Sequence, residues 1–475
     1  MPAPVVSIAQ MKEWEQATWA AGKTQAEVIR RVGRCVARLA LRLTRPNDAI
    51  LILAGKGHNG DDARAAAPHL GERRVEVLDV IEPEGELPKL ETHLASCPAL
   101  VIDGLFGIGL DRSLSPTWVQ FIERLNGARV PILAVDVPSG LNAETGERQG
   151  AAVRATVTLT VGAPKKGSLS EVASPFVGRL EVATDVGLAA CALPSDKQWI
   201  LGEDFQGYPP PRMTATHKGS YGHLAIVAGS LGYHGAAVLA AHGAQRAQPG
   251  LITLHTMESV YHVVAPQLQA VMVSPWEPEA KMPGSAGALL VGPGLAAADL
   301  PDDVKMLVRN AWGDSPSPVV VDASALDWLP LEAAPKRSIR VITPHPGEAA
   351  RLLRSTARQV QADRFNALRN ISKRFGNTWV VLKGHQTLIG RSTGDIFVNS
   401  SGNPHLAQGG SGDVLSGFLA GLLTQPLLQE DPLKTICYAV WQHGAAADQL
   451  QATRSNWVVE DLLEVLGSAT PLCGN

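Results

Sequence analysis

The sequence predicts an α/β protein made of two three-layer α/β/α domains. Short apolar runs alternate with helical patterns in both halves, and most runs lack a polar/apolar alternation. Such runs are typical of strands buried on both faces of a parallel sheet. A third observation is the stretch YPPPRMTATHKGSYG (208–222), whose prolines favour extended backbone and interrupt the pattern. We therefore expect one domain over 1–205 and a second over 206–475.

The first half contains five expected strands. They lie at 49–54, 75–80, 99–103, 130–136 and 155–161. The clearest helix between them is SPTWVQFIERLNG, where Ser115 can cap the helix, Pro116 fits the first helical position and Gly127 can end it. Its apolar residues share one face, namely Trp118, Ile122 and Leu125.

The second half repeats the alternation of strands and helices. Its expected strands lie at 223–228, 251–255, 288–292, 318–322, 340–343 and 379–384. The segment QTLIGRSTGDIFVN reads as a hairpin, because a polar turn with glycine separates two strand-like runs. This half is therefore expected to add antiparallel strands to a parallel sheet.

Composition excludes several classes of protein. Hydrophobic residues make up 45% of the 475 residues and charged residues 18%, which is typical of a soluble globular protein. The net charge of −3 offers no basic surface for nucleic acid or for an anionic membrane. Neither a signal peptide nor a membrane-spanning segment is expected. The cysteines are five in number and form no CxxC pair, which favours a reducing cytoplasm over a disulfide framework or a zinc site.

The strongest local motif is AQGGSGDVLSGFLAGLL (407–423). Its glycines leave backbone N–H groups uncovered, and a helical pattern starts at Val414. Glycine-rich turns at a helix N-terminus bind anions, because N–H donors and the positive end of the helix dipole converge there. Asp413 sits where the helix starts, so it could deprotonate a hydroxyl while the amides stabilise a phosphate. The alternative is that Asp413 only caps the helix.

Four further motifs accompany this turn. They are HKGSYGHLAIVAGSLGYHGAAVLAA (217–241), LLVGPGL (289–295), ITPHPGEAARLL (342–353), with Glu348 near a helix start, and VVLKGHQTLIG (380–390), with Lys383 after a strand. Each alone could be turn chemistry. The series resembles the NAD(P)H-hydrate dehydratase family, which has a ribokinase-like fold. Its members phosphorylate the C6 hydroxyl of hydrated nicotinamide and eliminate phosphate, and the bacterial ones use ADP.

This resemblance implies two groups of site residues in the second domain. An adenylate site would be lined by Lys383, Gly384, His385, Gln386, Thr387 and Gly412. Contacts to the hydrated nicotinamide nucleotide would come from Ala236, Gly294, His345 and Asp413, with Asp413 as the catalytic base. Mg²⁺ is expected to be held largely by phosphates and water, since no dedicated carboxylate cage is evident. Two positions depart from the family pattern, Gln408 before GGSGD and Ser324 in VDASAL, and neither carries an assigned role.

Histidines offer a competing interpretation of the same half. His234, His385 and His405 are tempting metal ligands, but no metal-type spacing links them. We interpret them as loop histidines.

The first half contains three loops that follow expected strands. They are GKGHNGDD after 49–54, GLFGIGLDR after 99–103 and VPSGLNAETG after 130–136. Ligands bind outside the carboxyl ends of strands in open α/β sheets, so these loops should gather on one edge. The alternative for Asp103 and Asp136, which end two of the strands, is that they only cap turns.

The three loops resemble those of the NAD(P)H-hydrate epimerase family, which has a Rossmann-like fold. The resemblance implies a potassium site at Asn59, Asp103 and Ser139. Asp136 would be the acid/base that interconverts the R and S hydrates. The implied substrate contacts are His58, Asn59, Gly60, Asp61, Asp62, Gly107, Ile108, Gly109, Leu110, Asp111, Arg112, Ser113 and Asp136.

The first of these loops departs from the family pattern. NNGGDG is replaced by HNGDDA, with His58, Asp61 and Ala63 as the changed positions. Asp61 places a carboxylate beside Asp62 where phosphates should dock, and a side chain where glycine could be needed for backbone shape. We hypothesise that the epimerase half is weakened or retained mainly as a structural partner.

Taken together, the sequence resembles a bifunctional NAD(P)H-hydrate repair enzyme that acts on small molecules and forms a homo-oligomer. One alternative is a ribokinase-like kinase of the hydroxymethylpyrimidine or thiazole type. Another is a non-catalytic nucleotide-binding or interaction module in the first half. The preference between NADH and NADPH hydrates, and between ADP and ATP, stays open.

Overall fold

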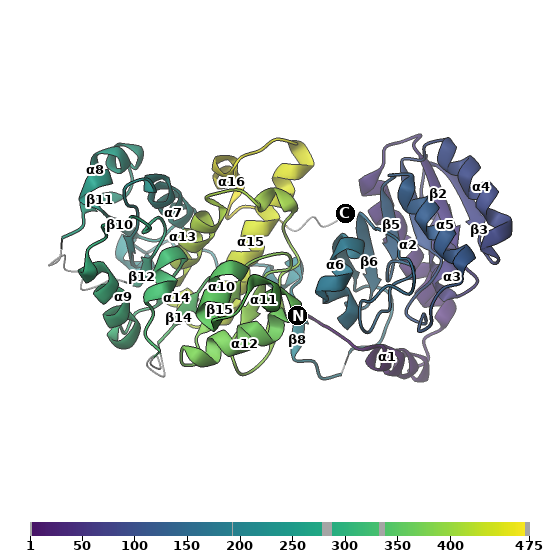
Figure 1. Cartoon of the computed structure of the whole chain (residues 1–475), viewed down its shortest axis with the longest axis horizontal. Helices are drawn as coiled ribbons and strands as arrows, with labels where there is room; N and C mark the ends of the chain where they lie inside the picture. Colours follow the sequence, from purple (N-terminus) through teal and green to yellow (C-terminus); the bar gives the residue numbers. More distant parts are fainter. Residues whose placement is uncertain (1, 192, 278–286, 332–337, 471–475) are drawn as a thin grey trace. The chain divides into compact units, whose positions relative to one another are not determined.

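The computed structural model of the chain describes residues 2–191, 193–277, 287–331 and 338–470 (Figure 1). The chain divides into two compact units, the first containing Ala3–Trp199 and the second beginning at Ile200. Each unit has a mainly parallel central sheet with helices on both faces, which confirms the predicted α/β class. In the described part of the chain, no helix is both long and apolar enough to cross a membrane.

The six-stranded sheet of the first unit is parallel throughout. Its strands follow the order β3-β2-β4-β5-β6-β7. Their bounds are β2 (Ala49–Ala54), β3 (Arg74–Asp79), β4 (Leu100–Gly104), β5 (Ile132–Val135), β6 (Val157–Val161) and β7 (Arg179–Ala183). All five expected strands are present, and β7 is an addition. A short antiparallel ladder pairs β1 (Ala3–Pro4) with β8 (Lys197–Trp199).

Both faces of this sheet are buried, which explains why its strands lack polar alternation. Alternate residues of β2 belong to two different apolar cores: Ile50 and Ile52 pack with α2 and α3, and Leu51 and Leu53 pack with α4 and α5. The helices are α1 (Ile8–Ala20), α2 (Gln25–Leu43), α3 (His58–Arg64), α4 (Pro83–Ala95), α5 (Pro116–Gly127) and α6 (Ser174–Val177). The predicted cap of α5 is confirmed, since Ser115 Oγ accepts from Trp118 N at 3.4 Å.

The sheet of the second unit combines a parallel body with an antiparallel edge. Strands β15 to β11 follow the order β15-β14-β13-β12-β9-β10-β11 and pair in parallel, and β16 and β17 add the predicted hairpin beside β15. The bounds are β9 (His223–Val227), β10 (Leu251–Thr256), β11 (Met272–Pro275), β12 (Ala288–Val291), β13 (Val319–Val321), β14 (Arg340–Ile342), β15 (Trp379–Leu382), β16 (Leu388–Gly390) and β17 (Ile396–Val398). Strand β11 is the one not expected from the sequence.

Helices α13 and α7 pack directly against each other. The helices of this unit are α7 (His234–Arg246), α8 (Glu258–Val264), α9 (Asp302–Asp314), α10 (Pro346–Leu353), α11 (Ala357–Ala362), α12 (Arg364–Arg374), α13 (Ser411–Leu423), α14 (Pro426–Gln429), α15 (Pro432–Thr453) and α16 (Val459–Val465). A Cβ on Gly417 would lie 1.9 Å from Ala240 O, and a Cβ on Gly243 would lie 2.3 Å from Val414 O. Glycine at both positions therefore lets α13 approach α7 closely, which fixes the start of α13 beside the sheet.

Candidate active sites at the strand ends of the two sheets

The glycine-rich turn before α13 has the shape expected of an anion cradle. Gly410 occupies the N-cap position with a left-handed φ of 93°, and a Cβ there would lie 2.4 Å from Leu239 Cδ1. Asp413 lies in the first helical turn rather than at the cap, so its carboxylate is not used as an N-cap. A first-turn Asp is also common at ordinary helix starts, so the role of Asp413 as a base stays a prediction.

A buried histidine hydrogen-bonds to the glycine-rich turn. His443 of α15 lies with Nε2 3.0 Å from Ser411 O. Burial lowers the pKa of His443 to about 4, so the ring is neutral at physiological pH. Because the carbonyl can only accept, Nε2 carries the hydrogen and donates it.

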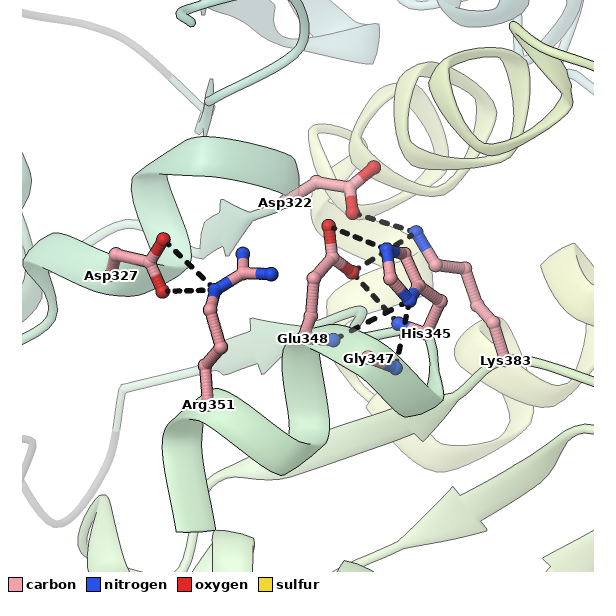
Figure 2. Close-up of polar contacts among 7 residues, drawn as sticks. All are labelled: Asp322, Asp327, His345, Gly347, Glu348, Arg351 and Lys383. Carbon is pink, nitrogen blue, oxygen red and sulfur yellow. Dashed lines mark hydrogen bonds and ion pairs between the residues drawn. The ribbon is translucent and has the colours of Figure 1, made fainter. Parts of the chain in front are cut away.

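Lys383 lies beneath the same helix start. It follows β15, and its Nζ lies 2.9 Å from Oδ1 of Asp322 and 4.0 Å from Oε2 of Glu348 (Figure 2). A Cβ built on Gly412 would lie 3.3 Å from Lys383 Nζ. The ammonium is thus held between two buried carboxylates and directly under the GGSGD backbone.

The electrostatics of this cluster set the protonation of Asp413. Burial, and after it the charge of Asp322, raise the pKa of Asp413 to about 7, although Lys383 opposes the rise. For Lys383, burial lowers the pKa, but the carboxylates of Asp322, Glu348 and Asp413 outweigh it and the net shift is upward. At neutral pH the site therefore holds an ammonium and a carboxyl group that can gain or lose its proton.

His345 connects this cluster to α10. Its Nδ1 accepts from the backbone N–H groups of Gly347 at 3.0 Å and Glu348 at 3.4 Å, and its own N donates to Glu348 Oε2 at 2.8 Å (Figure 2). This reciprocal cap fixes the Glu348 side chain. The His345 side chain is 54% exposed, so its outer edge stays open to a ligand.

Two of the expected substrate residues of the second unit lie side by side, Ala236 in the first turn of α7 and Gly294 in the loop after β12. Gly294 has a φ of 66°, and a Cβ there would lie 2.4 Å from Tyr233 O and 2.9 Å from Ala236 Cβ. Ser230 joins the two segments, because its Oγ donates to Gly294 O at 2.6 Å. The structure thus brings Ala236 and Gly294 together.

The expected adenylate loop is anchored by an arginine that sequence analysis did not single out. Arg364 of α12 donates to the carbonyl oxygens of Leu382 at 3.2 Å and Gln386 at 3.4 Å, and also to that of His385. Burial lowers the pKa of Arg364 to about 10. Left-handed φ values of 137° at Gly384 and 52° at Gln386 give the loop its shape.

Besides Arg364, three charged residues of this unit that form ion pairs were not identified from the sequence, namely Asp322, Arg351 and Asp327. Asp322 directly follows β13, and the VDASAL segment was noted only for Ser324. The sequence could have indicated Asp322. It directly follows a buried strand, as Lys383 does, so the two residues were expected at the same edge of the sheet. The pair Arg351 and Asp327, 3.1 Å apart, is exposed, and Arg351 also interacts electrostatically with Glu348 (Figure 2).

In the first unit, the expected potassium residues form one hydrogen-bonded group. Ser139 Oγ donates to Asp103 Oδ1 at 2.6 Å, Ser139 N donates to Asp103 Oδ2 at 2.9 Å, and Asn59 Nδ2 donates to Phe106 O at 2.9 Å. Asp103 also accepts from Leu105 N at 3.2 Å, so it does order its loop, as the capping alternative supposed. Burial raises the pKa of Asp103 to about 6, against the hydrogen bonds that lower it. No cationic side chain within the described ranges pairs with this carboxylate.

Asp136 follows β5 and has a left-handed backbone, with φ 67°. Its Oδ1 accepts from Val161 N at 2.9 Å and from Lys165 Nζ, and lies 3.2 Å from Thr160 Oγ1. The Lys165 side chain is fully buried. Sequence analysis noted neither Lys165 nor Thr160.

Asp62 and Glu15 share this site with Asp136. Burial raises the pKa of Asp62 to about 8, with further contributions from Asp136, Asp61 and Glu15. Burial and then Asp136 also raise the pKa of Glu15, which lies on α1. The site therefore contains one carboxyl group that is protonated at neutral pH beside a second one bound to an ammonium.

The altered loop residues behave differently from what the sequence suggested. Asp61 lies within α3 and has an ordinary helical backbone, so the expectation that glycine could be needed for backbone shape is wrong. Its carboxylate pairs with Arg64 at 2.9 Å and lies 3.6 Å from His58 Nδ1. Arg64 also bonds to Asp79 at 2.7 Å. The charge added by Asp61 is therefore partly neutralised by residues of its own helix.

Only part of the second expected contact loop, residues 107–113, lies close to the other site residues. Gly107 lies beside Asn59, where an added Cβ would be 3.2 Å from Asn59 Cβ, and Ile108 packs against the core that contains Trp14. The structure places the remaining residues further out, with Leu110 half-buried and Gly109, Asp111, Arg112 and Ser113 exposed.

Family models match both units. The model described as NAD(P)H-hydrate dehydratase matches residues 224–468, and the model described as YjeF-related protein N-terminus matches residues 25–97 and 78–167.

Full-length relatives carry both regions. The bifunctional NAD(P)H-hydrate repair enzyme Nnr of Gloeobacter violaceus is 34% identical over 94% of this chain and 94% of its own length. Those of Coxiella burnetii and Escherichia coli are 31% and 32% identical, over 93% and 85% of this chain and 93% and 81% of their own lengths. Among solved structures, the ADP/ATP-dependent NAD(P)H-hydrate dehydratase of Bacillus subtilis, co-crystallised with ATP and Mg²⁺, is 32% identical with a TM-score of 0.51, covering 56% of this chain and 95% of that one.

Proposed function

The chain belongs to the family of bifunctional NAD(P)H-hydrate repair enzymes, and from this premise we propose how its two sites divide the repair. The second unit dehydrates the S form of hydrated NADH or NADPH with ADP as phosphoryl donor. The first unit interconverts the R and S forms. The full-length relatives and both family models support this reading over the small-molecule kinase alternative.

One observation supports the dehydratase proposal most strongly: Lys383 lies 2.9 Å from Asp322 and under Gly412, beside an Asp413 whose pKa is raised to about 7. Asp413 takes the proton of the C6 hydroxyl, and the oxygen attacks the terminal phosphorus of ADP. The phosphorus–oxygen bond to the leaving AMP then breaks. The GGSG amides and Lys383 stabilise the charge on the transferring group.

Elimination follows from the same bound position. The ring nitrogen supplies its electron pair, the carbon–oxygen bond to phosphate breaks, and loss of a proton restores the dihydronicotinamide. Phosphate leaves far more readily than hydroxide, which is why the donor is needed. The arrangement of His345, Ala236 and Gly294 is suited to holding the hydrated nucleotide.

Mg²⁺ use is part of the proposal for this site. A side chain that fits this hard cation is Glu348, because its carboxylate is buried and fixed by His345. It lies 4.0 Å from Lys383 Nζ, whereas Asp322 bonds to that ammonium at 2.9 Å. When bound, the ion would neutralise phosphate charge. Lys383 would bind phosphate oxygens, and Arg364 would keep the adenylate loop in place.

For the first unit we propose Asp136 as the acid/base and K⁺ as the bound cation. Asn59, Asp103 and Ser139 would hold K⁺. Ser139 bonds to the buried Asp103 carboxylate, which lacks a cationic partner among the described residues, and both Ser139 and Asn59 bond to the backbone of Phe106. We also propose that the protein is a cytoplasmic homo-oligomer, in keeping with the free thiols of Cys35, Cys97, Cys191 and Cys437. Light scattering on the purified protein measures the assembly.

The decisive test uses S-form hydrated NADH, ADP and Mg²⁺, with the return of the reduced-nicotinamide absorbance as readout. Asp413→Asn should abolish recovery, whereas the exposed Asp327→Asn is the matched control and should leave it unchanged. Omitting ADP should also stop recovery. No recovery with ADP or ATP, together with accumulation of a phosphorylated substrate, would instead support the kinase alternative.

A further inference from the structure

All three N–H groups of the Lys165 ammonium, which lies next to Asp136, are used in hydrogen bonds within the protein. Lys165 Nζ bonds to Asp136 Oδ1, to Thr160 Oγ1 at 3.1 Å and to Val161 O at 2.8 Å. An ammonium has three N–H groups, so none is left to bind a ligand. With its side chain fully buried, Lys165 is not placed to touch the substrate.

The same contacts distinguish the two oxygens of Asp136. Oδ1 receives Lys165 Nζ and Val161 N, the latter at 2.9 Å, and has Thr160 Oγ1 3.2 Å away. None of these three groups contacts Oδ2. The carboxylate is therefore fixed by one oxygen, and only the other can reach a substrate.

The backbone around Lys165 is itself pinned. The N-terminal segment bonds to both sides of the lysine, with Val6 N donating to Pro164 O at 2.9 Å and Lys166 N donating to Val6 O at 3.0 Å. Val6 is fully buried in a core with Ala163. The position of the ammonium is thus set by packing and not by a flexible side chain.

We propose that Lys165 is a positioning residue of the epimerase site, which holds Asp136 in one orientation and leaves only its Oδ2 to exchange a proton with the substrate. The inference rests on the proposed function of the first unit and assigns a role to a residue beyond it. Lys165 acts through Asp136 and touches no reacting atom.

This arrangement suits an epimerisation in which one carboxylate removes a proton from the substrate and a second carboxyl group donates one. C6 of the hydrate bears a hydroxyl and the ring nitrogen. Asp136 Oδ2 takes the hydroxyl proton, the C6–O bond becomes a carbonyl, and the C6–N1 bond breaks with its electron pair on N1. The carboxyl group of Asp62 protonates N1. Rotation and re-attack of N1 on the other face of the carbonyl reverse both proton transfers and give the other epimer.

Asp136 interacts with Lys165, with Asp62 on α3 and with Glu15 on α1; Asp61 also acts on Asp62, and His58 and Lys12 act on Glu15. Among these described groups, Lys165 is the cation that bonds to Asp136 itself. Lys165→Met therefore removes the charge that favours the ionised form of Asp136. The acidic limb of the R-to-S rate should move to higher pH, and kcat at pH 7 should fall by about tenfold or more, with KM changing little.

Two further variants complete the experiment. Lys166→Met is the matched control, because Lys166 is exposed and lies 4.0 Å from Glu144; its rate and pH profile should equal those of the wild type. Thr160→Val removes a neutral group from the same carboxylate oxygen, so kcat should fall about threefold without a comparable shift of the pH limb. Folding is checked by circular dichroism.

The outcomes separate the inference from the function it rests on. Wild-type protein that fails to convert R-form hydrate would overturn the proposed epimerase. Conversion by the wild type with an unchanged pH limb in folded Lys165→Met would overturn only the role of Lys165. If Lys165→Met does not fold, Thr160→Val decides: a kcat equal to wild type contradicts the inference and a reduced kcat at constant KM supports it.

Discussion

The ammonium of Lys383 lies 2.9 Å from Oδ1 of Asp322, although 60 residues separate the two positions in the chain and each follows a different strand of the sheet. Asp322 is buried and Lys383 nearly so. Because breaking a buried pair leaves an uncompensated charge, the contact holds Lys383 firmly under the GGSGD turn. Burial, and after it the negative charge of Asp322, raises the pKa of the nearby Asp413 to about 7, whereas Lys383 opposes the rise.

The first prediction concerns the pH dependence of dehydration. As the proposed base, Asp413 would act only when ionised, and burial raises its pKa to about 7, so the rate should fall as pH drops through that value and be full above it. Asp322→Asn removes a negative neighbour and frees Lys383, and both changes lower the pKa of Asp413. The acidic limb should therefore move to lower pH while kcat falls about tenfold to a hundredfold through misplacement of Lys383. Rates measured from pH 5 to pH 9 on S-form hydrate, with Asp327→Asn as control, test this.

The second prediction concerns potassium and stability. The folded pKa of Asp103 is about 6, above its unfolded value, so its contribution to stability is present below about pH 4 and is lost as pH rises through 6. The loss is about 3 kcal/mol. The proposed K⁺ would bind the ionised carboxylate, so KCl should raise the melting temperature of the first unit more at pH 8 than at pH 5, relative to choline chloride of equal ionic strength. Asp103→Asn should remove both effects; a persisting K⁺ effect would place the ion elsewhere.

The third prediction addresses the altered loop of the first unit. Asp61 adds a negative charge near the expected phosphate position, but Arg64 neutralises part of it. Asp61→Asn should therefore lower the KM for R-form hydrate only about twofold to fivefold and leave kcat unchanged. A normal R-to-S rate in the wild type would contradict our hypothesis that this half is weakened.

The fourth prediction concerns the adenylate loop. Arg364 bonds to three carbonyl oxygens of the segment around Lys383–Thr387, so Arg364→Leu should loosen the loop and raise the KM for ADP by about tenfold. Arg369 on the same helix instead donates to Gly394 O at 3.0 Å, in the hairpin turn. Arg369→Leu should therefore leave the KM for ADP unchanged, and equal effects of the two substitutions would indicate general destabilisation of α12.

The sequence by itself determined the α/β class, most strand positions and the loops that carry the two sites. Local patterns suffice for these, because an unbroken apolar run such as Ile50–Ala54 must be buried on both faces, and a GGSGD turn must precede a helix. What only the tertiary structure decided is which charges meet. Asp322, Glu348 and Lys383 come from segments after three different strands, and Lys165 reaches Asp136 only because β5 and β6 are neighbours. Their protonation depends on burial and on these distant neighbours, and neither quantity is encoded in the spacing of residues along the chain.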